Sequence, residues 1–509
     1  MGARERTAAM LDSLVGLFSP KAESQRRFYR QRLDLAKRFA GASLAEHMAG
    51  WNPAEKNFND LVASASPVLR ARVAALVRDF PAFTRASNVL VNFTVGTGIP
   101  FQSRVRESGS PANSKKKPSF DHKINGLIED GFKRWMDEAH AGGQLHFHEL
   151  QRLAKRQDGE AGEYFFVKVR LPERGRYLPF ALQPFEANWL TETGARPQGK
   201  NKVHQGVEYE PTTGRPVAYH FEDPDSWGKP KRILARDVIH GFKTLVPGQM
   251  RGVSPFAPAI MLARSLGSYI QSEINVAEMA SRWLGTIHSD DPVSYQKQRT
   301  TTDPTTKVKT EVINGVILEY MDNGSKIEFA NPQRPTGNLE PASKLILRLI
   351  AVCLDVPYEL ISGDYSGYSY SGLRGARNDL LQMFRPKQAR LVRQLCNPVF
   401  VEFLDWTQLA GRFTLPGYWQ DPWRYRQPHW FPPTIESVDL LRDAKGYAAL
   451  IKLGAATPQQ FSAMRGFDFE QNLDDIEEAV AMAEMRDLTL GEVGAALASN
   501  PAAQEKKSA

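Results

Sequence analysis

At 509 residues, the chain is too long for one hydrophobic core, so we expect about two to four lobes. Its 42% hydrophobic and 24% charged residues are typical of ordinary globular proteins, and no window approaches the roughly 20 apolar residues of a membrane helix. With only two cysteines, a disulfide framework and a cysteine-based metal site are excluded. The net charge of +8 is scattered along the chain, which permits an acidic partner but does not identify one.

The N-terminal third is predicted to be largely helical after an irregular arm. Residues 1–60 show little periodicity, and we expect this arm to be partly disordered. A helix is predicted from Ser66 to a break at Pro81, and a second one continues to about Val95. Amphipathic spacing over residues 124–139 predicts a further helix.

The pattern then changes to the short runs that are typical of strands. Between Gln144 and Phe242, apolar runs are separated by Gly, Pro, Asp and Asn. Residues 210–214 lie between two such runs and predict a hairpin turn. A β-rich lobe beside long helices makes the expected fold class α+β.

Two long helices with a small β element between them follow this lobe. Ser254 is suited to cap the first, which is predicted to run from Pro255 to Leu284. The second is predicted from about residue 340 to 355. Asn323-Gly324 between alternating apolar runs is a hairpin signal, so the β element is expected at the far end of the helix pair.

A tip of small and aromatic residues joins the second helix to a much longer one. The tip spans residues 362–371, and its Gly and Ser residues predict a flexible loop whose rings either stack on a ligand or pack internally. Its three tyrosines are Tyr365, Tyr368 and Tyr370. Helical spacing resumes and lasts to Gly411, with Pro386 and Pro398 expected to kink or split the helix.

Two patterns approach known ligand sites without completing them. Residues 194–201 nearly match a phosphate-binding loop, but Asn201 lacks the required hydroxyl and Pro197 lacks an N–H, so a surface turn is favoured. His146 and His148 would suit a metal on a strand edge, although structural histidines are the favoured interpretation.

Catalysis is not indicated elsewhere. Asp290, Asp291 and Asp322 could be imagined as a nuclease carboxylate set, but a loop and a turn account for them equally well. No nucleophile, base and orienting group come together, so we predict no catalytic residue, no cofactor and no metal, and we expect that the protein is not an enzyme.

Taken in order, several stretches resemble the portal protein of tailed bacteriophages, specifically the lambda-type portal family. The resemblance extends from about Trp51 to Asp468, and the Pro-Gly-Gln-Met-Arg-Gly run at 247–252 is fairly specific. The other matching stretches are 69–72, 96–99, 162–163, 214–219, 237–240, 355–359 and 370–371. Residues 369–372 depart from the Asn-Tyr-Ser-Ser pattern of the family, which leaves the contacts of that loop open.

This resemblance implies a ring, commonly of twelve subunits, at one vertex of the capsid, through which double-stranded DNA is packaged and ejected. It implies a portal-type division of the chain: an N-terminal arm at 1–60, a wing at 61–254, a stem helix out at 255–285, a clip at 286–337, a stem helix back at 338–360, a tunnel loop at 361–373, a long wing helix with a Trp/Pro-rich connection at 374–433, and a crown with a mobile tail at 434–509.

The resemblance also implies partners and contact residues. The clip would dock the terminase large subunit and then the head–tail adaptor, and the major capsid protein or scaffold would surround the ring, in the host cytoplasm during assembly and then in the virion. No membrane is involved. Implied tunnel-loop residues near DNA are Tyr365, Ser366, Tyr368, Ser369, Tyr370 and Arg374. Implied docking residues of the clip are Tyr320, Asp322, Asn323, Lys326 and Glu328.

A conduit should let DNA slide. Lys or Arg side chains on every phosphate would hold the duplex, so we expect most of the positive charge to lie away from the lumen and no reading of base edges. Two other functions stay open: a DNA-packaging nuclease, which would cleave DNA with a divalent metal, and another head–tail adaptor or minor capsid component.

Overall fold

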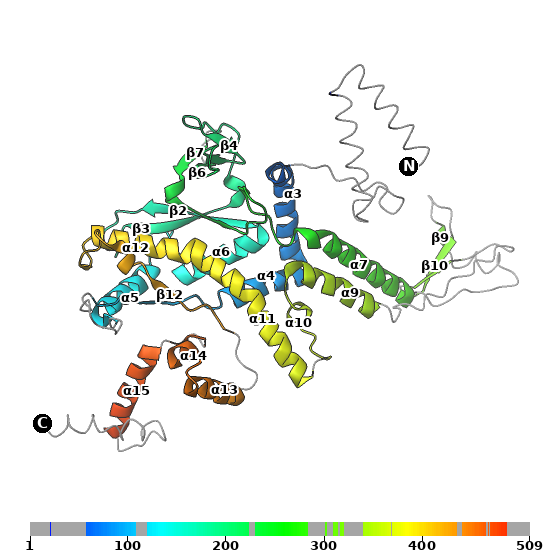
Figure 1. Cartoon of the computed structure of the whole chain (residues 1–509). Coiled ribbons are helices and arrows are strands. Elements are labelled where there is room, and N and C mark those ends of the chain that lie inside the picture. Colours follow the sequence, from blue (N-terminus) through cyan, green and yellow to red (C-terminus); the bar gives the residue numbers. More distant parts are fainter. Residues whose placement is uncertain are drawn as a thin grey trace, which may run out of the picture. The chain divides into compact units, whose positions relative to one another are not determined.

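The computed structural model combines helices and sheets, which confirms the mixed helix-and-sheet class (Figure 1). It describes Lys21 and residues 57–107, 120–222, 230–282, 301–302, 309–313, 316–319, 339–367, 369–434, 440–464, 467 and 469–485. Residues Met1–Leu61 and Val62–Ala509 form two compact units. The elements below belong to the second unit, apart from the first turn of one helix.

Two helices open the described chain: α3 (Phe58–Asp79) and α4 (Pro81–Thr94). The break predicted at Pro81 is confirmed, but the start predicted at Ser66 is wrong, because α3 begins eight residues earlier and contains Pro67. Its buried face runs unbroken past the proline, whose ring is exposed, so tertiary packing outweighs the lost backbone hydrogen bond.

Two antiparallel sheets form the β-rich lobe. One has the order β3–β2–β8, and the other is a meander of β4, β5, β6 and β7. The strands are β2 (Glu163–Arg170), β3 (Phe180–Phe185), β4 (Lys202–His204), β5 (Val207–Tyr209), β6 (Pro216–Phe221), β7 (Lys231–Leu234) and β8 (Val238–Phe242). The hairpin turn predicted at 210–214 joins β5 to β6 and is confirmed, with Gly214 at φ 70°.

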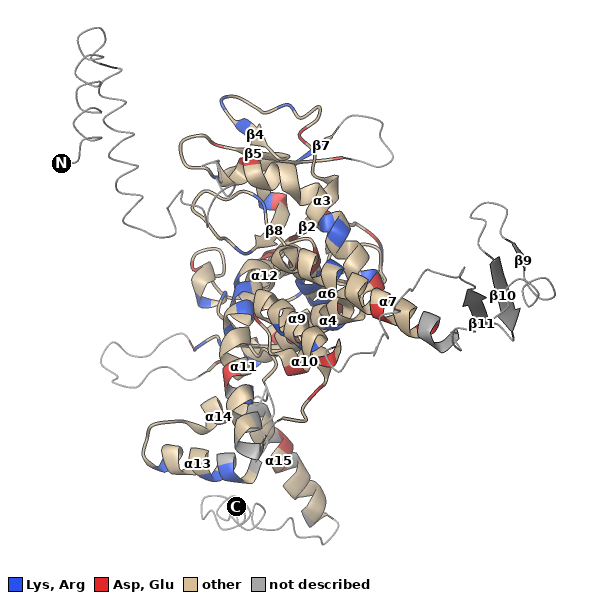
Figure 2. Cartoon of the chain, turned by 90° about the vertical axis from the view of Figure 1, so that its right-hand side faces the viewer, with Lys and Arg blue, Asp and Glu red and all other residues tan. Residues whose placement is uncertain are grey.

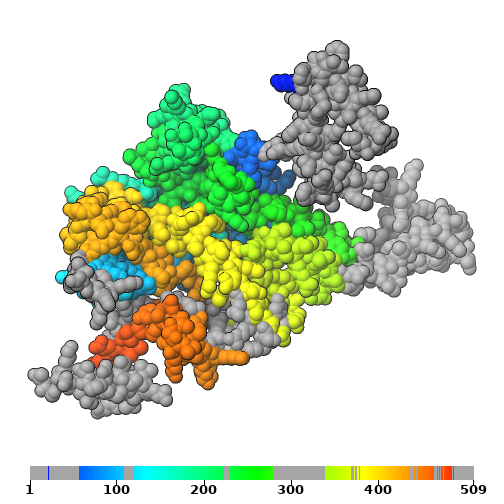
Figure 3. All heavy atoms as spheres, viewed as in Figure 1, coloured from blue at the N-terminus to red at the C-terminus, as the bar shows by residue number. Residues whose placement is uncertain are grey.

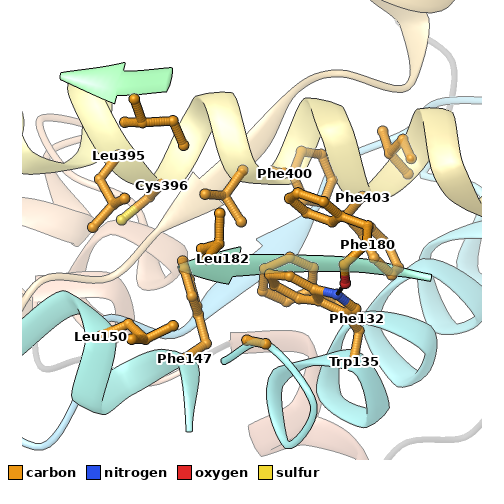
Figure 4. Packing of buried hydrophobic residues seen from close by; sticks show 14 of the residues in the cluster. Phe132, Trp135, Phe147, Leu150, Phe180, Leu182, Leu395, Cys396, Phe400 and Phe403 are labelled. Carbon is orange, nitrogen blue, oxygen red and sulfur yellow. Dashed lines mark hydrogen bonds between the residues drawn. The ribbon is translucent and has the colours of Figure 1, made fainter. Parts of the chain in front are cut away.

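The largest hydrophobic core lies between two short helices and the end of the long one. Figure 4 shows side chains of α5 (His122–Met136) and α6 (Phe147–Glu160) meeting those of α12 (Asn397–Leu409) around strand β3. Trp135 stacks on Phe180 with ring centroids 5.2 Å apart, and its indole N–H donates to the carbonyl of Phe180 at 2.8 Å. A short two-stranded sheet, β1 (Phe101–Ser103) with β12 (Pro428–Trp430), packs against this core.

The long helix predicted up to Gly411 is present and is divided as expected. It consists of α11 (Tyr370–Leu391), a π-helical segment (Val392–Cys396) and α12. Pro386 lies inside α11, and Pro398 lies in the first turn of α12. Pro398 has no N–H and cannot donate the backbone hydrogen bond that an α-helix would form to the preceding turn. The wider π turn just before it avoids the need for this hydrogen bond.

The pair of helices after the β lobe is also found. Helices α7 (Ile260–Arg282) and α9 (Leu339–Leu354) pack side by side (Figure 1). The predicted start at Pro255 is wrong, because a 3-10 turn (Ala257–Ala259) precedes α7, whereas the hydroxyl of Ser254 does accept the N–H of Phe256 at 3.1 Å.

A small antiparallel sheet lies between these helices in the sequence. Its strands are β9 (Thr301–Thr302), β10 (Lys309–Ile313) and β11 (Val316–Glu319). Because Ile313 pairs with Val316, the connection falls at Asn314-Gly315. This second Asn-Gly signal was overlooked in the sequence, and the one predicted at 323–324 lies outside the described residues.

Three short helices follow near the C-terminus, as predicted: α13 (Leu440–Lys452), α14 (Pro458–Met464) and α15 (Phe469–Glu484). Thr457 and Gln460 form a reciprocal cap at the start of α14, with side-chain to backbone distances of 3.2 and 3.0 Å. Among the residues described, we find no helix with the length and apolarity that crossing a membrane requires.

Candidate functional site

The tip predicted between the second and third long helices is an exposed loop. It starts where α10 (Tyr358–Ser362) ends at Gly363, whose φ of 73° is the left-handed conformation typical of a helix stop. It ends where the hydroxyl of Ser369 accepts the N–H of Gly372 at 3.2 Å and caps α11. Figure 1 shows this tip at the free ends of α10 and α11.

A carboxylate of the tip forms an ion pair with helix α9. Asp364 accepts two hydrogen bonds from Ser366, from the hydroxyl at 2.5 Å and the backbone N–H at 3.1 Å. It also pairs with Lys344 of α9 at 3.1 Å, and Lys344 pairs with Glu340 at 2.7 Å. The bonds from Ser366, and then Lys344, lower the pKa of Asp364 to about 2, so this group stays ionised.

The structure brings together three of the predicted tunnel-loop residues. Tyr365 is 47% exposed, Ser366 is exposed, and Ser369 is the helix cap. Tyr368 lies outside the described residues. Helix α11 includes Tyr370 and Arg374, but their side chains are not described. All five predicted clip residues also lie outside them: Tyr320, Asp322, Asn323, Lys326 and Glu328.

Below the exposed tip, the supporting helices are firmly packed. A second hydrophobic core joins α3, α4, α7, α9, α10 and α11, and in Figure 3 the surfaces of α9 and α11 adjoin. The guanidinium of Arg85 donates to the carbonyl of Leu360 at 3.0 Å, and Lys387 donates to the carboxylate of Asp355 at 2.6 Å. Both the segment before the tip and helix α11 after it are thus packed and hydrogen-bonded to neighbouring elements.

The near-match to a phosphate-binding loop is a surface turn, as favoured from the sequence. The carboxylate of Glu208 accepts the backbone N–H of Gln198 at 3.0 Å and the side-chain amide of Asn201 at 2.7 Å. These donors therefore already serve an anion of the chain itself, and strand β4 follows in place of the required helix.

The histidine pair is not on a strand, which corrects the prediction. His146 caps α6: its ring accepts the N–H of His148 at 3.1 Å, and Glu149 accepts the N–H of His146 at 2.9 Å. Burial, and then His146, lower the pKa of His148 to about 4. The described part of the chain has no group of three His, Cys, Asp or Glu that suits a metal, and Asp290 and Asp291 lie outside it.

A buried carboxylate that was not predicted from the sequence joins four stretches of the chain. Glu163 is fully buried at the start of β2 and accepts hydrogen bonds from α3, from β8 and from the loop segment 251–252. Its partners are Arg70 of α3 at 2.7 Å, Arg251 at 2.5 and 2.8 Å, His240 of β8 at 3.1 Å and the N–H of Gly252 at 2.8 Å. We call this set the Glu163 junction.

Its partners keep Glu163 ionised although this carboxylate is fully buried. Burial would raise the pKa of Glu163, but Arg251 and His240 hold it well below its ordinary value. Burial lowers the pKa of Arg70 to about 10 and also lowers the pKa of His240. Arg251 further donates to the carbonyls of Gln205 and Ala187, at 2.7 and 2.8 Å, and thereby joins the two sheets.

Two glycines let the backbones at the junction meet. A Cβ on Gly252 would lie 2.1 Å from the carbonyl oxygen of Gly162, and one on Gly162 would lie 2.3 Å from the backbone carbon of Val253. Only glycine fits this approach. In the sequence, the usable signal was a glycine next to a charged residue in two separate stretches, Gly162-Glu163 and Arg251-Gly252.

Comparison with known proteins identifies the family. Residues 45–388 match the family model described as phage portal protein, lambda family. The chain belongs to this family. The resemblance stated from the sequence is thereby confirmed, and the chain is a phage portal protein.

Relatives of this portal protein are distant. It is 23% identical over 390 residues to a probable portal protein of Halomonas phage phiHAP-1, covering 71% of each chain. It is 20% identical over 255 residues to portal protein B of Escherichia phage lambda, covering 46% of this chain and 48% of that one. A chain from the neck of an empty GTA particle superimposes with a TM-score of 0.40 at 14% identity, covering 83% of this chain and 98% of that one.

The Glu163 junction explains much of the resemblance in physical terms. Four of the stretches that resemble the portal family contribute to it, through Arg70, Gly162-Glu163, His240 and Arg251-Gly252. These residues lie buried between the β lobe and the segment that leads into α7. In this portal protein they are therefore framework residues, whereas Tyr365 at the tip is exposed.

Proposed function

We propose that twelve copies of this chain form a ring at the unique vertex of the capsid, and that double-stranded DNA is packaged and ejected through its channel. The observation that carries the proposal is the match of residues 45–388 to the lambda family of portal proteins. The ring would be built in the host cytoplasm and retained in the virion.

The outer face of α9 supports assembly of identical copies. Leu345, Leu349 and Val352 are 58%, 44% and 76% exposed and recur along one side of the helix, while α7 covers another side. From Leu345 to Leu354 the helix has a single charged residue, Arg348. A helix that is apolar on every side is normally buried on every side. In a ring, the neighbouring copy would therefore cover the exposed side chains of α9.

The exposed tip is the proposed contact with passing DNA. Residues 361–373 would form the tunnel loop, with Tyr365, Tyr368 and Tyr370 near the duplex. Lys344 and Asp364 neutralise each other at its base, so this pair adds no net charge that would hold phosphates. A weakly charged lining with aromatic and hydroxyl groups allows sliding without sequence reading.

The remaining parts would bind the other components of the vertex. We assign residues 286–337 as the clip that docks the terminase large subunit and then the head–tail adaptor, through Tyr320, Asp322, Asn323, Lys326 and Glu328. The major capsid protein or scaffold would contact the periphery of the ring. The chain would be a structural component without cofactor, and the terminase ATPase would supply the energy of translocation.

Native mass spectrometry and electron microscopy of the purified full chain test this proposal. We expect a closed ring of about twelve times 57.0 kDa with a central hole and projecting two-helix stems. A chain that stays monomeric at high concentration would contradict it. A ring without helical stems would point to another head–tail component, and magnesium-dependent cleavage of DNA by the pure chain would point to a nuclease.

A further inference from the structure

The three C-terminal helices have almost no core of their own. Among the described residues between Leu440 and Met485, Ala483 is the one that is buried. Large apolar side chains are instead 42–79% exposed: Leu441, Leu450, Leu453, Phe467, Leu473, Met482 and Met485. Helices this short do not persist in water by propensity alone, so another surface must cover these side chains.

Two of these helices carry opposite charge, as Figure 2 shows. Helix α15 contains six carboxylates and no Lys or Arg, whereas α13 contains Arg442, Lys445 and Lys452 against a single Asp443. Within the chain, α13 meets α14 through the rings of Tyr447 and Phe461, whose centroids are 4.9 Å apart, and α14 meets α15. The basic and acidic helices thus lie on either side of α14 in the chain order.

We propose that α15 of one copy packs against α13 of the adjacent copy, so that apolar side chains of both helices are buried and their charges are paired. The inference rests on the proposed ring. In a closed ring of identical copies, each protomer presents one surface to the neighbour on one side and a different surface to the neighbour on the other. A basic and an acidic helix meet this requirement, because two α13 helices or two α15 helices would repel each other.

Charge reversal on each helix tests the contact. One variant carries Lys445→Glu and Lys452→Glu on α13, which leaves that helix with three acidic residues and Arg442. The other carries Asp474→Lys, Asp475→Lys, Glu477→Lys and Glu478→Lys on α15, which leaves that helix with four lysines and two carboxylates. The side chains of Lys445, Lys452, Asp475 and Glu477 are exposed. Each variant alone would face like charges at every interface. We expect the protein concentration at which its ring half-dissociates to rise about tenfold at low salt, measured by mass photometry on dilution.

An equal mixture of the two variants is the decisive sample. In an alternating ring, the acidic α13 of one variant meets the basic α15 of the other, and the remaining interface joins basic α13 to acidic α15, so wild-type ring stability returns. Lys200→Glu with Lys231→Glu, at two exposed lysines of the β lobe, changes the charge as much as the α13 variant does and serves as its control. We expect it to leave ring stability unchanged.

Three results would overturn the contact. If all the α13 and α15 substitutions together in one chain restore the ring while the mixture does not, α13 and α15 pair within a chain. If each variant forms rings as stable as the wild type, these helices do not meet across copies, and the ring itself still stands. If the wild-type chain forms no ring, the proposed function fails and this contact fails with it.

Discussion

The Glu163 junction and the tip at 362–371 contrast in how they use charge. In the junction, one buried carboxylate is shared by two buried guanidinium groups, a histidine and a backbone N–H. At the tip, the partly exposed Asp364 accepts hydrogen bonds from Ser366 of the same loop and forms an ion pair with Lys344 of α9. Both carboxylates have lowered pKa values. Removal of the Glu163 carboxylate would leave the buried guanidinium groups of Arg70 and Arg251 without their counter-charge. Removal of the Asp364 carboxylate would leave Lys344, which water can solvate.

The contrast separates buried residues of the family resemblance from an exposed loop. The residues that resemble the portal family most specifically fix how the β lobe meets the helix pair. Of the residues expected to face DNA, Tyr365, Ser366 and Ser369 are exposed, and residues 369–372 depart from the family pattern. A series of substitutions tests whether stability depends on the junction and is insensitive to the tip.

The largest loss is expected for Glu163→Gln. The amide cannot neutralise Arg70 and Arg251, whose side chains are only 9% and 3% exposed, so the free energy of unfolding should fall by about 3–5 kcal/mol. Urea denaturation at pH 7 measures this. Glu173→Gln is the control, because Glu173 is 63% exposed in its ion pair with Arg176 and should change stability by less than about 0.5 kcal/mol. Equal effects of the two changes would contradict the contrast.

A loss nearly as large is expected for Gly252→Ala. The new methyl group would collide with the backbone of Gly162, and we expect a cost of about 2–3 kcal/mol in the same assay. Gly267→Ala in α7 is the matched change, since no atom lies within 4 Å of its Cβ position, and it should stabilise the helix by about 0.5–1 kcal/mol. A harmless Gly252→Ala would show that the close approach is not needed.

A moderate effect of pH is expected at His148. Its pKa is lowered to about 4 in the folded chain, so between about pH 6.5 and pH 4 the unfolded state binds more protons and stability falls as the pH falls. Partial solvent exposure limits the loss to about 1–2 kcal/mol. In unfolding at pH 7 and pH 5, His148→Gln should flatten this slope, and His122→Gln, at an exposed position, should keep it. If the dependence of stability on pH is unchanged in His148→Gln, another group causes it.

The smallest effect is expected for Asp364→Asn. The side chain lies at the surface, so we predict no measurable change in Tm, together with faster amide hydrogen exchange in residues 363–367 as the ties to Ser366 and Lys344 weaken. Lys344→Gln should behave in the same way. A clear loss of Tm in either variant would make the tip part of the stable framework and erase the contrast.

Local patterns predicted much of the fold, and long-range packing explains one of the errors. The break at Pro81, the turn at 210–214 and the divided long helix follow from proline and glycine chemistry that acts within a few residues. The start of α3 was misjudged because its buried face, which no short window displays, carries the helix past Pro67. The prediction of a strand at His146 is wrong for a local reason: His146 and Glu149 form a capping box, but histidine is not one of the residue types that usually mark a helix start.

The candidate site was predicted in part, for a similar reason. Spacing of tyrosine, glycine and serine was enough to locate the tip, and Tyr365 is exposed as expected of a contact residue. The tie from Lys344 and the partners of Glu163 were not predicted, because they join residues that are 20 to 93 positions apart. The tunnel-loop and clip assignments remain predictions.

The position of Tyr365 in the assembled ring is the decisive test of the proposed function. A compact label on Tyr365→Cys, in a chain with Cys353→Ser to remove the half-buried native thiol, would be located by electron microscopy of the ring. We predict label density inside the narrowest part of the central bore. Label density on the outer wall, away from the bore, would contradict it.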